Sequence, residues 1–266
     1  MDNKFSPIGD VLADLKKGKM VVITDDENRE NEGDIVLAGQ FATPDKINFI
    51  VKHARGLICA PMEETLINRL RLFPMHRENT DPFKTDWMIS VDAVKGVTTG
   101  ISAHDRARTL KLLADPATPA EALTRPGHVF PLKAKKGGVL SRAGHTEACV
   151  DLLKLAGLMP SGVICEIMKD DGSMARLPDL LAFAAKYKLK ISTIAALIAY
   201  RRRTESFVEL LAVSRLPTEH GDYEIRVYRD KLTGLEHVAM ILGVLKSPVL
   251  VRVHSECLTG DVLGSE

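Results

Sequence analysis

Residues 25–34, with the sequence DDENRENEGD, place six carboxylates and one arginine within ten positions. They directly follow a short apolar stretch, residues 20–23, which predicts a β-strand. Carboxylates gathered at a strand end are suitable ligands for a hard divalent cation, and strand ends are where ligand loops lie in α/β folds. A solvated surface turn is the alternative for any charged run. This segment alone leaves the two interpretations about even.

Spacing within this run adds a geometric expectation. In an extended loop, alternate residues share a face, so Glu30, Glu32 and Asp34 would project to the same side. Gly33 is a point where the backbone can turn tightly or approach a ligand.

Three further segments carry residue types that could act with the acidic run. Residues 125–131 (RPGHVFP) place His128 between turn formers, which predicts a loop. Residues 137–148 (GGVLSRAGHTEA) contain Arg142 and His145. Residues 162–167 (GVICEI) read as a buried strand that carries Glu166, and DDGSMAR follows at 170–176. A single histidine or glutamate is more often structural than catalytic, but this combination in this order is a specific signal.

These segments together resemble the 3,4-dihydroxy-2-butanone-4-phosphate synthase family of riboflavin biosynthesis. The resemblance covers about residues 5–202 and includes VTTGISAHDRA at 97–107. One departure lies at residues 79–87, where members of the family usually carry a small or glycine-containing loop. Here Phe83, Lys84 and Trp87 make the loop bulkier, which could alter its closure over the substrate.

The resemblance implies a lyase that converts ribulose 5-phosphate to 3,4-dihydroxy-2-butanone 4-phosphate and formate. It places the metal ligands at Glu30 and His145, a set that suits Mg²⁺ (or Mn²⁺) with the remaining ligands from water and substrate. It also makes Asp34 a contact to a substrate hydroxyl, and we expect Glu32 to support a metal-bound water. It further implies a homodimer in which each active site is completed by the neighbouring subunit.

The substrate's phosphate has its own candidate site. Arg142 can bind a phosphate through two hydrogen bonds, Gly144 permits close approach of the backbone, and Thr146 is expected to open a helix whose N-terminal amides favour an anion. The full set of expected substrate-binding residues is Arg29, Glu30, Asp34, Arg142, Ala143, Gly144, His145, Thr146 and Glu166.

His128 and Glu166 are the expected catalytic residues. Histidine is easily tuned near neutral pH, and burial of Glu166 in an apolar strand would favour its neutral form. The sequence leaves their order of action open. It also leaves open whether Cys59 lines the site or is a plain buried thiol, the latter being the commoner case.

The rest of the chain has a different pattern. Residues 204–266 resemble the beginning of GTP cyclohydrolase II, with the clearest match at 247–265. Four strands are expected there, at 207–213, 223–228, 237–245 and 249–254. Cys257 matches only the first of that family's three zinc cysteines, so we expect no GTP cyclohydrolase II activity from this stretch.

Composition limits the remaining possibilities. With 36 basic and 35 acidic residues, the chain has no basic character that would favour nucleic acid. No stretch is apolar enough to span a membrane, and residues 1–7 do not read as a signal peptide, so a cytoplasmic protein is expected. The four cysteines are widely scattered and read as reduced thiols.

The alternation of helical and strand patterns up to about residue 203 predicts a layered α/β (α+β) domain, with a mixed sheet and surrounding helices. We therefore expect a synthase domain at 1–203 and an all-β partial domain at 204–266. Two other functions remain open: a different metal-dependent sugar-phosphate lyase or phosphatase, and a synthase-like module that binds a ligand or partner and turns over slowly.

Overall fold

The computed structural model describes residues 4–263 and 265, so the outermost residues of both predicted domains lie outside the described part. The chain divides into one compact unit up to Glu205 and a second from Ser206. Each unit is described here by itself.

The first unit is built on a mixed sheet that contains eight strands within the described residues. Seven of them follow the order β4-β6-β3-β7-β2-β1-β8, and β5 pairs with β6 outside this path. Strands β1 and β8 are parallel, as are β3 and β6, whereas β2 is antiparallel to both of its neighbours. The strands are β1 (Val21–Thr24), β2 (Gly33–Ala38), β3 (Cys59–Met62), β4 (Asp86–Trp87), β5 (Val91–Ala93), β6 (Leu123–Lys133), β7 (Gly162–Glu166) and β8 (Lys190–Thr193).

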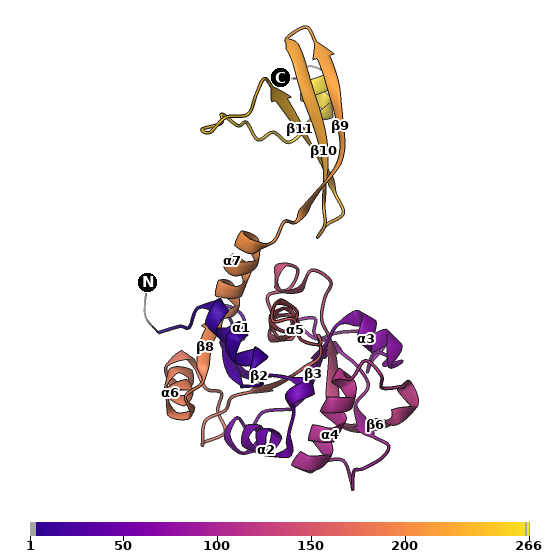
Figure 1. Ribbon diagram of the computed structural model, residues 1–266, viewed down its shortest axis with the longest axis vertical. Coiled ribbons are helices and arrows are strands. Elements are labelled where there is room, and N and C mark those ends of the chain that lie inside the picture. Colours follow the sequence, from indigo (N-terminus) through magenta and orange to yellow (C-terminus); the bar gives the residue numbers. More distant parts are fainter. Residues whose placement is uncertain (1–3, 264, 266) are drawn as a thin grey trace. The chain divides into compact units, whose positions relative to one another are not determined.

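Helices cover both faces of this sheet, as Figure 1 shows for α2 and α4 on one side and α1 and α5 on the other. The helices are α1 (Ile8–Lys16), α2 (Pro44–His53), α3 (Glu64–Arg69), α4 (Ala103–Ala114), α5 (His145–Leu155), α6 (Leu177–Tyr187) and α7 (Ile194–Thr204). The predicted layered α/β domain with a mixed sheet and surrounding helices is confirmed.

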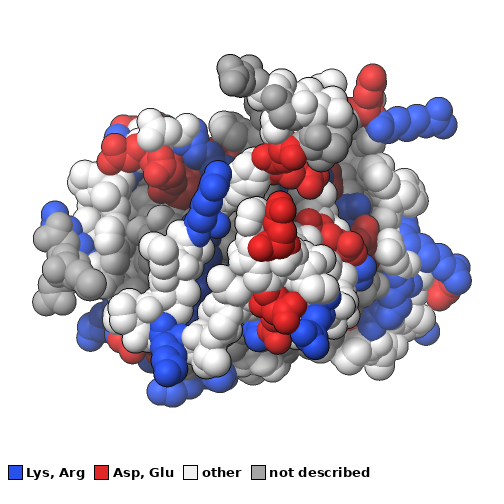
Figure 2. Space-filling view, turned by 90° about the horizontal axis from the view of Figure 1, so that it is seen from above, with Lys and Arg blue, Asp and Glu red and all other residues white. Residues whose placement is uncertain are grey.

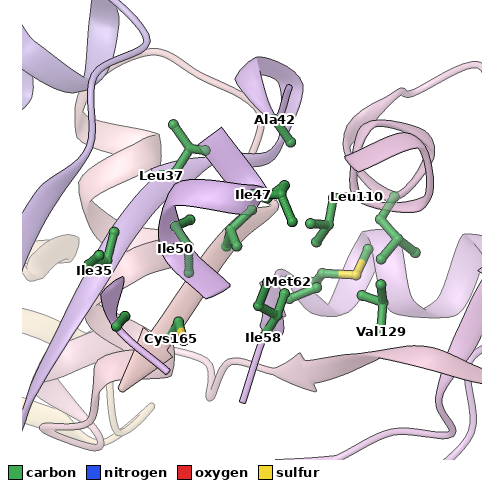
Figure 3. Close-up of a cluster of buried hydrophobic side chains, with 14 of the residues drawn as sticks. Ile35, Leu37, Ala42, Ile47, Ile50, Ile58, Met62, Leu110, Val129 and Cys165 are labelled. Carbon is green, nitrogen blue, oxygen red and sulfur yellow. The ribbon is translucent and has the colours of Figure 1, made fainter. Parts of the chain in front are cut away.

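Alternation along the strands explains why two separate cores form. Ile35 and Leu37 of β2 point to the side of α2 and α4, where they join the apolar cluster drawn in Figure 3. Val36, between them, points to the opposite side and packs with residues of α1, α5 and α7. Because all six positions of β2 are buried, this strand lies at the centre of the layered structure.

The helix starts follow local signals in the sequence. Thr43 caps α2 by accepting a hydrogen bond from the backbone N–H of Lys46, and Ser102 caps α4 in the same way through Asp105. Helix α4 ends at Ala114, directly before the Asp115-Pro116 pair that predicted its end.

Two predictions about the first unit are wrong. His128 does not lie on a loop, because residues 123–133 form the long strand β6 despite their proline and glycine. The acidic run is also not extended: residues 27–30 form a turn, and Asn31 has a positive φ of 55° that interrupts the strand-like alternation.

The second unit contains a three-stranded antiparallel sheet in the order β11-β10-β9. Its strands are β9 (Val208–Thr218), β10 (Gly221–Asp230) and β11 (Glu236–Leu242). The all-β partial domain is confirmed, but the predicted fourth strand at 249–254 is wrong. That segment is apolar, yet it has no strand neighbour within the described residues.

None of the helices in the described part of the chain is long and apolar enough to cross a membrane.

On the face drawn in Figure 2, lysine and arginine side chains are interspersed with aspartate and glutamate.

Candidate functional site

The turn that follows β1 is organised by Asp25. Its carboxylate accepts hydrogen bonds from the backbone N–H groups of Glu30 (3.1 Å) and Glu32 (2.8 Å), and from the Arg29 guanidinium (2.9 Å). Arg176, from the DDGSMAR segment, donates to the backbone carbonyl of Glu30 at 2.8 Å. Both residues therefore hold the backbone that presents the Glu30 side chain, a role that no local pattern in the sequence indicates.

His145 faces this turn as the first residue of α5. Its Nδ1 atom lies 3.5 Å from Glu30 Oε2 and 4.0 Å from Asp34 Oδ1. His145 Nε2 and Asp34 Oδ1 are both buried without a hydrogen-bond partner among the described residues. Buried polar atoms without partners are costly, so this pair of atoms favours a site that receives a further group.

The donor atoms at this point fit a metal ion. One oxygen each from Asp25 and Glu30 and a ring nitrogen of His145 all lie within 4.8 Å of one another. Carboxylate oxygens with one imidazole form a donor set compatible with Mg²⁺ or Mn²⁺. Since Asp25 already accepts three hydrogen bonds, Glu30 and His145 are the better candidates for direct ligands, in line with the sequence-based expectation.

The protonation of this cluster reflects its burial and crowding. Burial is the main cause that raises the pKa of Asp34 to about 7, and the neighbouring Glu166 and Glu30 act in the same direction. Burial would lower the pKa of His145, but the charges of Asp34 and Glu30 outweigh it and raise that pKa to about 9. In the absence of a cation, the imidazolium therefore supplies the positive charge that the carboxylates need.

Glu166 belongs to the same cluster because its strand is paired with the strand that carries Asp34. It ends β7 and is paired directly across from Asp34 of β2. Its Oε2 atom accepts a hydrogen bond from the backbone N–H of Leu57 at 2.9 Å. A Cβ atom at position 56 would overlap Glu166, so Gly56 allows this carboxylate its place.

Cys59 lies near these carboxylates but is buried. Burial, together with the charges of Glu166 and Asp34, raises the pKa of the Cys59 thiol well above its ordinary value. Whether Cys59 lines the site or is a plain buried thiol stays a prediction.

The second candidate acid–base residue, His128, is held separately by Asp92. Its Nδ1 atom lies 2.6 Å from Asp92 Oδ2, and its backbone N–H donates to Asp92 Oδ1 at 3.0 Å. These contacts within the described residues do not join His128 to Glu30, His145 or Glu166. Asp92 was missed in the sequence, because nothing local marks a partner that lies 36 residues away.

Of the residues expected at the phosphate, Arg142 has the most contacts. Its guanidinium donates to Glu147, to the carbonyl of Phe83 (2.8 Å) and to the hydroxyl of Thr85 (2.7 Å). Glu147 is almost completely buried and was not singled out in the sequence.

The neighbours of Arg142 begin α5. Gly144 is its N-cap, and His145, not Thr146, is its first residue. Ala143 is exposed, whereas Thr146 is buried. The N-terminal amides of α5 thus begin beside both Arg142 and the metal cluster.

Arg29 lies in the turn that follows β1. It bridges Asp25 and Glu30, and its guanidinium carbon lies 5.1 Å from the centre of the Phe83 ring. The bulky loop at 79–87 therefore contacts both expected substrate-binding arginines.

Fold and site together define an α/β domain whose mixed sheet carries a cluster of carboxylates and one imidazole beside the N-terminus of a helix. Comparison with known protein families shows which family has this fold and site. Residues 9–200 match the family described as 3,4-dihydroxy-2-butanone 4-phosphate synthase, and residues 209–266 match GTP cyclohydrolase II. The chain belongs to the 3,4-dihydroxy-2-butanone 4-phosphate synthase family, which confirms the resemblance seen in the sequence.

Curated relatives are similar over nearly the whole chain. The riboflavin biosynthesis protein RibBA of Aquifex aeolicus is 56% identical over 98% of this chain and 66% of its own length. RibBA of a Synechocystis strain is 53% identical over 98% of this chain and 48% of its own length. The chain thus spans less than two thirds of the length of these relatives.

Solved structures give the same result. RibBX of A. baumannii, a two-domain 3,4-dihydroxy-2-butanone 4-phosphate synthase, is 45% identical with a TM-score of 0.81, over 90% of this chain and 70% of its own. A 3,4-dihydroxy-2-butanone 4-phosphate synthase in complex with two magnesium ions is 43% identical with a TM-score of 0.73, over 75% of this chain and 98% of its own.

Proposed function

We propose that this protein is a Mg²⁺- or Mn²⁺-dependent lyase that converts ribulose 5-phosphate to 3,4-dihydroxy-2-butanone 4-phosphate and formate. The observation that carries the proposal is the cluster of Glu30, Asp34 and His145, in which one buried atom each of Asp34 and His145 has no hydrogen-bond partner among the described residues. Family membership and the magnesium-bound relative support it further.

Glu30 and His145 would hold the cation, with Glu32 nearby to support a bound water. When bound, a divalent cation stabilises negative charge that develops on adjacent substrate oxygens. Asp34 would orient a substrate hydroxyl through Oδ1, the oxygen to which no described residue donates a hydrogen bond.

Glu166 and His128 are the two remaining candidates for proton transfer. The Oε2 atom of Glu166 is held by Leu57, which leaves Oε1 to accept or donate a proton at the substrate. His128 is bound through Nδ1 to Asp92, which leaves Nε2 for the same purpose. Both residues are oriented by a partner, as general acids and bases must be.

The phosphate would be bound at the start of α5. In this proposal Arg142 supplies charged N–H donors, while the backbone around Ala143, Gly144 and Thr146 supplies amides at the helix N-terminus. Arg29, which lies over the ring of Phe83, would contribute further positive charge to the site.

We further propose that residues 1–203 act as the synthase domain in a homodimer with two-fold symmetry. Membership of the family supports an arrangement in which each active site is completed by the neighbouring subunit. Light scattering tests this proposal, and an active monomer of 29.2 kDa would contradict it.

The stretch from 204 onward is proposed to have no GTP cyclohydrolase II activity of its own. In the described residues, Cys257 is exposed and is not part of any group of three potential metal ligands. We place the synthase activity in the cytoplasm, as the sequence predicts.

Release of formate from ribulose 5-phosphate is the experiment that tests the main proposal. Purified protein with Mg²⁺ or Mn²⁺ should release one formate for each ribulose 5-phosphate consumed, and excess chelator should stop the reaction. Full turnover in chelator would remove the metal from the proposal. A folded protein that binds the sugar phosphate without releasing formate would favour the binding-module alternative.

A further inference from the structure

The loop at 79–87 has a shape that is fixed from within. The backbone N–H of Thr85 donates to Asp81 Oδ2 at 2.7 Å, and Asn79 Nδ2 donates to the carbonyl of Thr85 at 2.9 Å. The loop then enters the sheet, where Asp86 pairs with Lys133. These contacts give the loop a defined position beside α5.

Arg142 is held on three sides by acceptors from this loop and from α5. The carbonyl of Phe83 accepts from Nε, the hydroxyl of Thr85 accepts from Nη2, and Glu147 accepts from Nη1. A guanidinium group is planar, so three acceptors around it fix both its position and its orientation.

The surroundings show that this placement is built into the fold. Glu147 is buried and is itself anchored by the backbone N–H of Lys135 at 3.0 Å. A Cβ atom at position 144 would overlap both Arg142 and Glu147, so Gly144 leaves space for the side chain of Arg142 to lie against α5.

Two donors of Arg142 remain for a ligand. Arginine has five N–H groups, and the bonds recorded within the described residues use three of them, which leaves one on Nη1 and one on Nη2. The side chain is 12% exposed, so a ligand can reach it. Guanidinium N–H groups of this kind are strong donors to a phosphate.

We propose that Thr85 is a positioning residue, whose hydroxyl orients Arg142 so that its remaining donors meet the substrate phosphate. This inference rests on the proposed function, in which Arg142 binds that phosphate. It assigns a role to the bulky loop, namely recognition of the phosphorylated end of the substrate.

A pair of variants at one position tests this inference. Thr85→Val keeps the shape of the side chain but removes the hydroxyl, whereas Thr85→Ser keeps the hydroxyl. Calorimetry in excess chelator measures binding of ribulose 5-phosphate without turnover. Thr85→Val should weaken binding about tenfold, the scale of one hydrogen bond to a charged group. Thr85→Ser should stay within about twofold of the wild type.

Two further arms separate positioning from general damage to the fold. Binding of ribulose, which lacks the phosphate, should be the same in the wild type and in Thr85→Val. In an Arg142→Ala background, Thr85→Val should cause no additional loss, because the residue through which Thr85 acts is gone.

Several results would overturn the inference. Unchanged or tighter binding by Thr85→Val would show that the loop is passive or competes with the phosphate for Arg142. An equal loss for ribulose, or a full additional loss in the Arg142→Ala background, would also exclude positioning. Formate release by the wild type is measured separately, so a failed inference and a failed proposed function give different results.

Discussion

The two units use similar strand patterns but differ in what happens to their apolar side chains. In the first unit, every residue of β1 and β2 is buried between layers of helices. In the second, Val213 of β9 is 52% exposed and Val238 of β11 is 60% exposed. Backbone pairing can form a sheet in both cases, but a core requires a second layer. The candidate site depends on that difference. The pKa values of its carboxylates and its imidazole are shifted because the covering helices exclude water.

Substitution of a histidine in each unit gives the largest contrast. His145→Gln removes the imidazole from the metal cluster and should lower kcat about a thousandfold. His254→Gln alters an exposed residue of the second unit, which bonds only to Asp261 among the described residues, and should leave formate release unchanged. The measurement is steady-state formate release with saturating Mg²⁺. Comparable losses in both variants would break the assignment of the site to the first unit.

Truncation of one apolar residue in each unit should separate them in stability. Leu37→Ala removes a fully buried side chain and should cost about 3 kcal/mol of unfolding free energy, whereas Val213→Ala should cost less than about 0.5 kcal/mol. Trp87 is the one tryptophan of the sequence and lies in the first unit, so its fluorescence in urea reports that unit alone. A large shift caused by Val213→Ala would show that the second unit supports the first.

A smaller effect concerns pH and is confined to the first unit. The pKa of His145 is raised from 6.5 to about 9, so the folded state holds this proton more tightly than the unfolded state. The resulting stability is complete below pH 6.5 and is lost as the pH rises through 9. Without metal, the melting temperature of the Trp87 transition should fall by a few degrees over this range.

Magnesium and His145→Gln are the controls for this pH effect. Asp34, whose pKa is raised from 3.8 to about 7, contributes in the same direction at lower pH. Mg²⁺ binds neutral imidazole in place of the proton and should flatten the curve. His145→Gln should flatten it above pH 6.5, and an unchanged slope in that variant would assign the titration to another group.

The sequence predicts those features of this molecule that are local. Thr43 and Ser102 act as helix caps because a cap needs only the next three residues. The acidic run, His145 and Glu166 were recognised as a set through the family resemblance, and the structure brings Glu30, Asp34, His145 and Glu166 together.

Features that depend on distant partners could not be read in the same way. The segment at 249–254 has the composition of a strand, but a strand forms only where a neighbour provides hydrogen bonds. Residues 123–133 contain turn formers, yet pairing with β3, β4 and β5 makes them a strand. Likewise, the contact of Arg142 with Thr85 joins positions 57 residues apart, which a linear pattern does not reveal.

The pairing of β1 with β8 has a consequence for the synthesis of this protein. These strands are parallel neighbours, although Val21 and Lys190 are separated by about 170 residues. During translation, the strand that leads into the acidic turn emerges early, but its partner on one side is made only near the end of the first unit. A nascent chain must therefore keep an apolar strand edge unpaired for most of that time. Closure of this last strand pair is thus a late, long-range folding event.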